Sequence, residues 1–172
     1  MKTLMYLFVA VILVIAGCAK DETITNAPIA MKIDCMAVPD KKSDLIPINI
    51  PGQDVYYTYS KLNVSGAGSH LGKIDEEKSY YVINSSEYFT NENRLQYIRS
   101  LGHGKVTGEN NDGFEFTFWS NESLNNFKIV GELEITPKTG TGIFAGSSGT
   151  LNIIGSEANR LWLCLEGYLV FE

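Results

Sequence analysis

This 172-residue chain has no long apolar segment, no block of basic residues and only two histidines. Its longest apolar run, Leu4–Ala16, is shorter than the roughly 20 residues that a membrane-spanning helix needs, which excludes a multi-span membrane protein. The 14 Lys and Arg residues are scattered and outnumbered by 20 Asp and Glu, so the formal net charge is -6. An acidic chain without a basic patch is a poor match for DNA or RNA, and we expect no nucleic-acid partner.

The scarcity of histidine also bears on metals and catalysis. A metal site needs three or four convergent ligands, and neither His70 nor His103 has a second ligand at a suitable spacing. The glycines of Gly140–Gly146 miss the G-x-G-x-x-G spacing of dinucleotide-binding loops. Neither Ser69 nor Ser147 stands in a G-x-S-x-G nucleophile motif. The sequence therefore predicts no metal site, no cofactor and no catalytic residue.

An export signal is present at the N-terminus. Lys2 precedes the apolar run Leu4–Ala16, which has the length of a signal-peptide core. The run ends in Ile15-Ala16-Gly17-Cys18, which resembles the lipobox of bacterial lipoproteins. The resemblance implies that residues 1–17 are removed and that the Cys18 thiol is acylated as the lipid attachment site. The alternative is an ordinary signal peptide with a chance cysteine.

Residues 18–28 are predicted to be a lipidated, flexible tether, because they contain too little apolar surface to offset the entropy of ordering. Lys20-Asp21-Glu22 resembles the short export tag of some surface lipoproteins of Gram-negative bacteria. We therefore expect an exported outer-membrane lipoprotein at the cell surface, the alternative being the periplasmic face. Membrane contact is expected through the Cys18 anchor only.

The remaining domain, residues 29–172, is predicted to be all-β. Apolar and polar residues alternate along short segments, as in half-buried strands. Phe114, Phe116 and Phe118 share one face of such a segment, and the turn Asn110–Gly113 before it predicts a hairpin. The other predicted strands cover residues 29–38, 55–64, 79–84, 104–108, 127–136, 150–155 and 161–171.

Residues 86–102 fit this pattern less well. Asn91 is a candidate helix N-cap, Leu95, Ile98 and Leu101 recur at helical intervals, and Gly102 is a candidate stop. These features predict a short helix or insert, with an edge strand as the alternative. Antiparallel strands with one apolar face must close on themselves or stack. We therefore predict a single antiparallel, roughly eight-stranded closed barrel with one short helix or insert near 86–102.

Two glycine motifs support the barrel by resemblance. Gly66-Ala67-Gly68-Ser69-His70-Leu71-Gly72-Lys73 and, later, Gly140–Thr150 (GTGIFAGSSGT) resemble small secreted barrels of allene-oxide-cyclase-like type. The resemblance covers roughly residues 30–172 and implies an eight-stranded barrel. Plant members of that architecture cyclise an oxidised fatty acid, but no motif here carries their active-site residues.

Two cysteines remain besides Cys18. Cys35 lies in the first predicted strand and Cys164 in the last, and these two strands pair in a closed barrel. Because exported proteins meet an oxidising compartment, the two are candidates for a disulfide. The alternative is two buried free thiols.

Candidate ligand contacts come from aromatic residues and one histidine. Tyrosines are concentrated in residues 56–59 and 80–81, where they suit either strand packing or ligand contact. We single out His70, Tyr57, Tyr59 and Trp119. The leading hypothesis is a non-enzymatic lipoprotein that binds a small molecule, glycan or protein through its barrel. The alternative is a cyclase or isomerase acting on a hydrophobic small molecule, which requires a lumen that is not filled by side chains.

Overall fold

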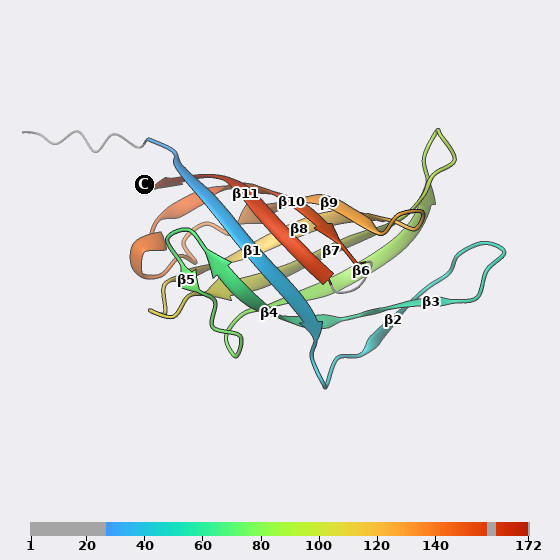
Figure 1. Cartoon of the computed structure of the whole chain (residues 1–172), viewed down its shortest axis with the longest axis horizontal. Helices are drawn as coiled ribbons and strands as arrows, with labels where there is room; N and C mark the ends of the chain where they lie inside the picture. The colour runs from blue at the N-terminus through green and yellow to red at the C-terminus, as the bar shows by residue number, and fades with distance from the viewer. Residues whose placement is uncertain (1–26, 158–160, 172) are drawn as a thin grey trace, which may run out of the picture.

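The computed structural model describes residues 27–157 and 161–171, and almost all of its regular structure is β (Figure 1). The predicted signal peptide 1–17, Cys18 and the tether up to residue 26 lie outside the described residues. The strands are β1 (Ile29–Pro39), β2 (Leu45–Ile48), β3 (Tyr56–Tyr59), β4 (Lys61–Gly68), β5 (Gly72–Lys73), β6 (Tyr80–Thr90), β7 (Gln96–Thr107), β8 (Gly113–Ser123), β9 (Lys128–Ile135), β10 (Ser147–Ser156) and β11 (Leu161–Phe171).

Eight antiparallel strands close into a barrel. The hydrogen-bonded order runs β1, β11, β10, β9, β8, β7, β6, β4, and β4 pairs again with β1. The shortest pairing in the ring is between β4 and β6, where only Lys61–Val82, Leu62–Tyr81 and Asn63–Tyr80 are paired. The predicted closed barrel is therefore confirmed. Strand β5 pairs with β4 alone, and β2 and β3 form a separate hairpin that projects beyond one end of the barrel (Figure 1).

The alternation in the sequence sets which side chains face the barrel interior. In β8, Phe114 and Phe116 are buried while the alternating residues Glu115 and Thr117 are exposed. The predicted hairpin before β8 forms, with Asn111 at a φ of 63° in the turn. Asn tolerates this left-handed conformation at low cost.

The helix predicted within residues 86–102 is wrong. The region is strand, as in the alternative, but β7 pairs with both β6 and β8 and is not an edge strand. Strands β6 and β7 continue through this region and meet in a tight turn. The Asn91 side chain accepts hydrogen bonds from the backbone N–H groups of Asn93 and Leu95, so it stabilises a turn and not a helix start. Ile98 is 2% exposed and Leu101 is 47% exposed. The apolar residues at helical spacing thus lie on opposite faces of one strand.

One end of the barrel is closed by packed side chains. A 3-10 turn, η1 (Gly142–Phe144), places Phe144 in the core, with its ring centroid 5.4 Å from that of Phe114. Leu71 and Ile74, from the segment around β5, are also buried in this core. The glycine segment at 140–146 therefore serves a turn that directs Phe144 inward. Among residues 27–157 and 161–171 there is no helix with the length and apolar content needed to cross a membrane.

Candidate functional site

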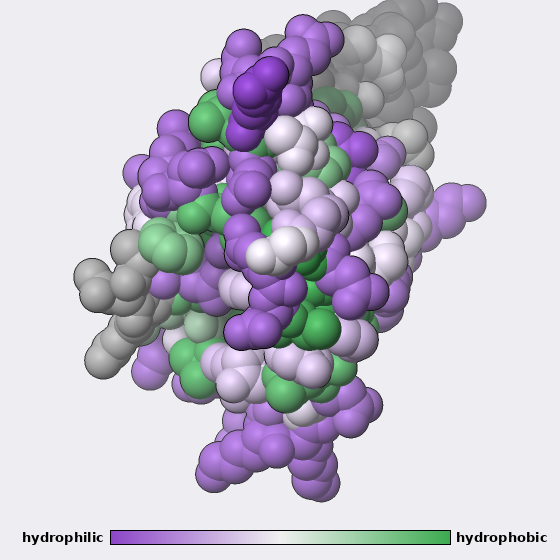
Figure 2. Space-filling model, turned by 90° about the vertical axis from the view of Figure 1, so that its right-hand side faces the viewer, coloured by the Kyte–Doolittle hydropathy of each residue, from purple (hydrophilic) through white to green (hydrophobic). Residues whose placement is uncertain are grey.

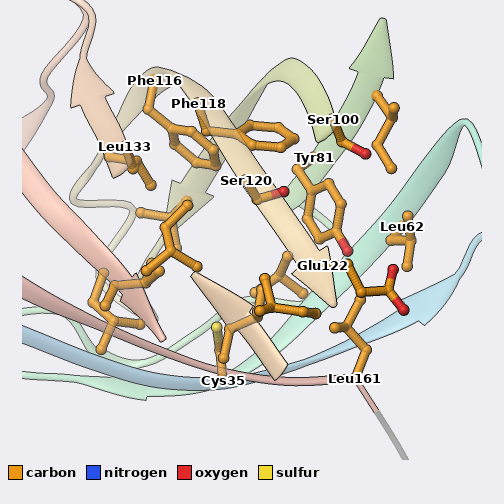
Figure 3. A pocket seen from close by; sticks show the side chains of 18 of the residues that line it. Cys35, Leu62, Tyr81, Ser100, Phe116, Phe118, Ser120, Glu122, Leu133 and Leu161 are labelled. Atoms are coloured by element: carbon orange, nitrogen blue, oxygen red, sulfur yellow. The ribbon is translucent and has the colours of Figure 1, made fainter. Parts of the chain in front are cut away.

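The barrel interior is only partly filled. Toward the end from which the β2–β3 hairpin projects, it contains a cavity of about 100 Å³. The cavity walls are mostly apolar and come from every strand of the ring (Figure 3). Its side chains include Leu62, Tyr81, Phe116, Phe118, Leu133 and Leu161.

The cavity opens to solvent at this end. Tyr59 and Glu157 both line it and both are exposed. Figure 2 views the molecule from the side on which the β2–β3 and β6–β7 hairpins project, and shows apolar surface interspersed among polar side chains. A small molecule can therefore approach the lumen from this end.

Two carboxyl groups meet beside the apolar lumen. Glu122 lies near the end of β8, opposite Ile98 on β7 and Ile129 on β9, so its side chain shares the inward face of the sheet. Glu157 follows β10, and its backbone N–H donates a hydrogen bond to the carbonyl of Phe127, 3.1 Å away. This turn contact holds Glu157 next to the end of β8.

The environment of Glu122 favours its protonated form. Burial, a hydrogen bond with Glu157 and the negative charge of Glu157 together raise the pKa of Glu122 to about 8. At neutral pH Glu122 therefore keeps its proton. The other Glu122 oxygen, Oε1, is buried without a hydrogen-bond partner. A buried acceptor without a partner is costly, and a ligand with a hydrogen-bond donor would satisfy it.

Two tyrosines lie close to Glu122 and Glu157, and one of them, Tyr81, lines the cavity. Tyr81 on β6 is 8% exposed, packs edge-on against Phe118, and directs its hydroxyl toward Glu122 (Figure 3). Burial, followed by the charge of Glu157, raises the pKa of Tyr81. The pKa of Tyr56 on β3 is also raised, by burial and then by the charge of Glu122. Both phenols thus stay protonated at neutral pH and can donate or accept a hydrogen bond.

The structure places the predicted ligand contacts apart from one another. Of the four, Tyr59 lines the cavity. Tyr57 is 54% exposed, and Trp119 lies on the outer face of β8 in a groove with Leu101. His70 is exposed in the turn after β4, at a φ of 66°. His70, Tyr57 and Trp119 are not among the residues that line the lumen.

The candidate disulfide between Cys35 and Cys164 is not formed in the structure, where both thiols are free and buried, as in the alternative. Strands β1 and β11 pair as expected, but Cys35 is opposite Leu163 and Cys164 is opposite Asp34. Because of this offset of one residue, Cys35 lines the lumen while Cys164 lies beside Glu166 on the outer face. Burial raises the pKa of Cys35 to about 12, so it is an inert thiol.

Glu122 and Glu157 were not predicted from the sequence. One signal for Glu122 was present: it continues the period of Phe114, Phe116 and Phe118, which places it on the inward face if the strand extends that far. The alternation that predicts this strand is clear only for Phe114, Phe116 and Phe118, whereas β8 continues to Ser123. Glu157 lies in a connection, where no periodicity indicates direction.

The described residues contain no group of three or more His, Cys, Asp or Glu side chains that could hold a metal ion. Comparison of the chain with protein-family models, curated proteins and solved structures finds no match. The candidate functional site therefore consists of the lumen and the acid pair, by which we mean Glu122 and Glu157.

Proposed function

We propose that this chain is an exported lipoprotein, anchored in the outer membrane through Cys18 and displayed at the cell surface, whose barrel binds a small molecule without transforming it. The observation that carries the proposal is the apolar lumen, which opens to solvent next to the acid pair. Apolar walls with a few convergent polar groups are typical of ligand sites.

The direction of β1 supports an opening that faces away from the membrane. Strand β1 begins at Ile29, which pairs with Leu169, and ends at Pro39, which pairs with Leu62 beside the cavity. The tether joins the first of these two ends. A barrel held by residues 18–28 therefore keeps its opening at the far end from the attachment.

The size of the lumen limits the ligand. A volume of about 100 Å³ is smaller than the roughly 150 Å³ apolar cavity that accommodates benzene. Only a narrow group fits inside, and the rest of the ligand extends past Tyr59 and Glu157. A glycan or a protein partner does not match this space.

Filling the lumen tests the proposal. Ser120 lines the cavity and is half-buried, so Ser120→Phe places a ring inside it. Thr117→Phe adds the same ring to the outer face of the same strand and is the matched control. We expect solvent extracts of purified wild-type and Thr117→Phe protein, analysed by mass spectrometry, to share a bound compound that is missing from Ser120→Phe. Identical extracts from all three would contradict a ligand in the lumen.

The second candidate function is a cyclase or isomerase acting in the same lumen, and the protonation of Glu122 favours it. A carboxyl group with a pKa near 8 beside an apolar space suits general acid–base catalysis. The extracted compound distinguishes the two functions when it is incubated with a trace of protein. A product of equal mass but different retention time, formed by wild type and not by Glu122→Gln, would establish an isomerase. Unchanged compound supports a binding protein.

A further inference from the structure

The acid pair lacks a cationic partner within residues 27–157 and 161–171. The ion pairs there are Lys32–Asp34, Lys32–Glu166, Lys61–Asp40 and Lys78–Asp75, and none involves Glu122 or Glu157. Two carboxyl groups in contact, without a described base, leave a site that attracts a positive charge.

Besides this negative charge, the site contains a buried oxygen that has no hydrogen-bond donor. Glu122 Oε1 is buried without a hydrogen-bond partner, and the Tyr81 hydroxyl ends beside Glu122 (Figure 3). An ammonium group has three N–H donors and one compact charge. It can donate to Glu122, Glu157 and the Tyr81 oxygen together, whereas an alcohol donates once and a carboxylate is repelled.

We infer that the lumen binds a primary amine with a short unbranched apolar chain, its ammonium group between Glu122 and Glu157 and its chain inside the barrel. This inference rests on the proposed function and names the ligand class for that site. The walls that receive the chain include Leu62, Phe118 and Leu161. Charge-assisted hydrogen bonds are roughly twice as strong as neutral ones, so the amine is favoured over an alcohol of equal length.

Binding of the amine is linked to pH. The titratable side chains that interact with Glu122 are Glu157 from the loop after β10, Tyr81 on β6 and Tyr56 on β3. Cys35 on β1 and Lys105 on β7 line the same cavity, and Lys105 is opposite Glu115, seven residues along β8 from Glu122. Glu122 releases its proton near pH 8, while an alkylammonium keeps its proton to about pH 10. The affinity therefore rises by up to about tenfold per pH unit toward pH 8.

The test uses three probes of one chain length: hexylamine, 1-hexanol and hexanoate. Calorimetry on the full chain in lipid nanodiscs, with empty nanodiscs as the blank, measures each at pH 6 and pH 8. We expect hexylamine to bind at least about tenfold more tightly than 1-hexanol at pH 8, a difference of about 1.4 kcal/mol. From pH 6 to pH 8 the hexylamine affinity should rise, the 1-hexanol affinity should stay constant, and hexanoate should bind no better.

Variants separate the charge from the fold. Glu122→Gln is expected to reduce hexylamine affinity at least about tenfold, to abolish its pH dependence and to leave 1-hexanol binding unchanged. Glu157→Gln, at an exposed position, gives a second measurement should Glu122→Gln fold poorly, with the same loss of preference expected. Glu115→Gln on the outer face of β8 is the control and has no effect.

Arg160 follows Glu157 closely in the sequence and lies outside the described residues. Arg160→Gln should leave hexylamine affinity within about twofold. A gain of about tenfold or more would mean that the chain neutralises the acid pair itself, which would overturn the inference.

The outcomes separate this inference from the proposed function. If 1-hexanol binds as tightly as hexylamine, or if Glu122→Gln keeps the preference for the amine, the amine assignment is wrong while ligand binding stands. If no probe binds but wild-type extracts contain a compound that Ser120→Phe lacks, the amine assignment alone is again wrong. If no probe binds and the extracts are identical, the lumen is not a ligand site.

Discussion

Glu122 is an ionisable residue at the end of an inward-facing row of aromatic and small side chains. Phe116, Phe118 and Ser120 precede it on the same face of β8, and all line the cavity. Its pKa of about 8 compares with an ordinary value of 4.5. The folded state therefore binds a proton that the unfolded chain releases over this range, and the free energy of unfolding must fall as pH rises from about 4.5 to 8.

We expect Glu122→Gln to remove this pH dependence. At pH 5 the variant should be about as stable as wild type, and at pH 8 it should be more stable by roughly 2 to 4 kcal/mol, because one pKa unit corresponds to about 1.4 kcal/mol. Urea denaturation at pH 5 and pH 8 measures the difference.

Glu115→Gln serves as the matched control for this measurement, since Glu115 is exposed on the opposite face of β8. Its stability should follow wild type at both values of pH. Equal pH profiles for wild type and Glu122→Gln would show that the Glu122 carboxyl group titrates normally.

The two cysteines show how far the sequence predicts which face of a strand a side chain lies on. The sequence correctly indicated that the strands of Cys35 and Cys164 pair. It did not indicate the offset that places Cys35 opposite Leu163. The side-chain direction reverses at each residue, so an offset of one converts a candidate bridge into two thiols on opposite faces.

Strand β4 closes the ring, and a glycine allows it to do so. Gly66 pairs with Cys35 of β1 and has a φ of 144°. A Cβ atom at this position would lie 2.2 Å from the carbonyl oxygen of Asp34. A side chain here would therefore push β4 away from β1 at the point where the barrel closes.

Gly66→Ala is expected to destabilise the protein by at least about 3 kcal/mol, through backbone strain together with this clash. Gly52→Ala is the comparison, because Gly52 also has a positive φ, 76°, but has nothing within 4 Å of its Cβ position. It should lose only about 1 kcal/mol. Urea denaturation of both variants measures the difference, and equal losses would show that the contact with β1 is not limiting.

The strands themselves were largely predictable, and the exception has a physical cause. Alternation located β1 and β11 closely because each has one clearly apolar face. Residues 86–102 misled because Leu95, Ile98 and Leu101 have the spacing of one helix face. In the β6–β7 hairpin the first and third of these are exposed, at 41% and 47%. Exposed leucines on a projecting hairpin cannot be distinguished from a buried helix face by spacing alone.

The site as a whole was less predictable than the fold, because its residues are brought together only when the strands close into a barrel. Glu122 comes from the end of β8 and Glu157 from the connection after β10, with β9 between them. Each is an ordinary acidic residue in the sequence. Only the closed ring turns both toward one opening, and only the packing of the core decides that about 100 Å³ of the lumen is left unfilled.

Attachment of the molecule to its membrane is tested at Cys18. We expect Cys18→Ser to release the protein from the membrane fraction, because the thiol that would be acylated is gone and a short apolar leader cannot replace it. Sedimentation and immunoblotting measure the change. Cys35→Ser is the control, since Cys35 lies inside the barrel, and it should remain with the membrane. Co-sedimentation of both variants with wild type would refute lipidation.

The path of the chain has a consequence for how cargo would be exchanged. The first residue of β1, Ile29, and the last residue of β11, Phe171, both lie at the end of the barrel where η1 lies (Figure 1). If the proposed Cys18 anchor is attached on that side, cargo would enter and leave from the aqueous phase and would not need to pass through lipid. Occupancy would then track the dissolved concentration outside the cell, as in a sampling device for the medium.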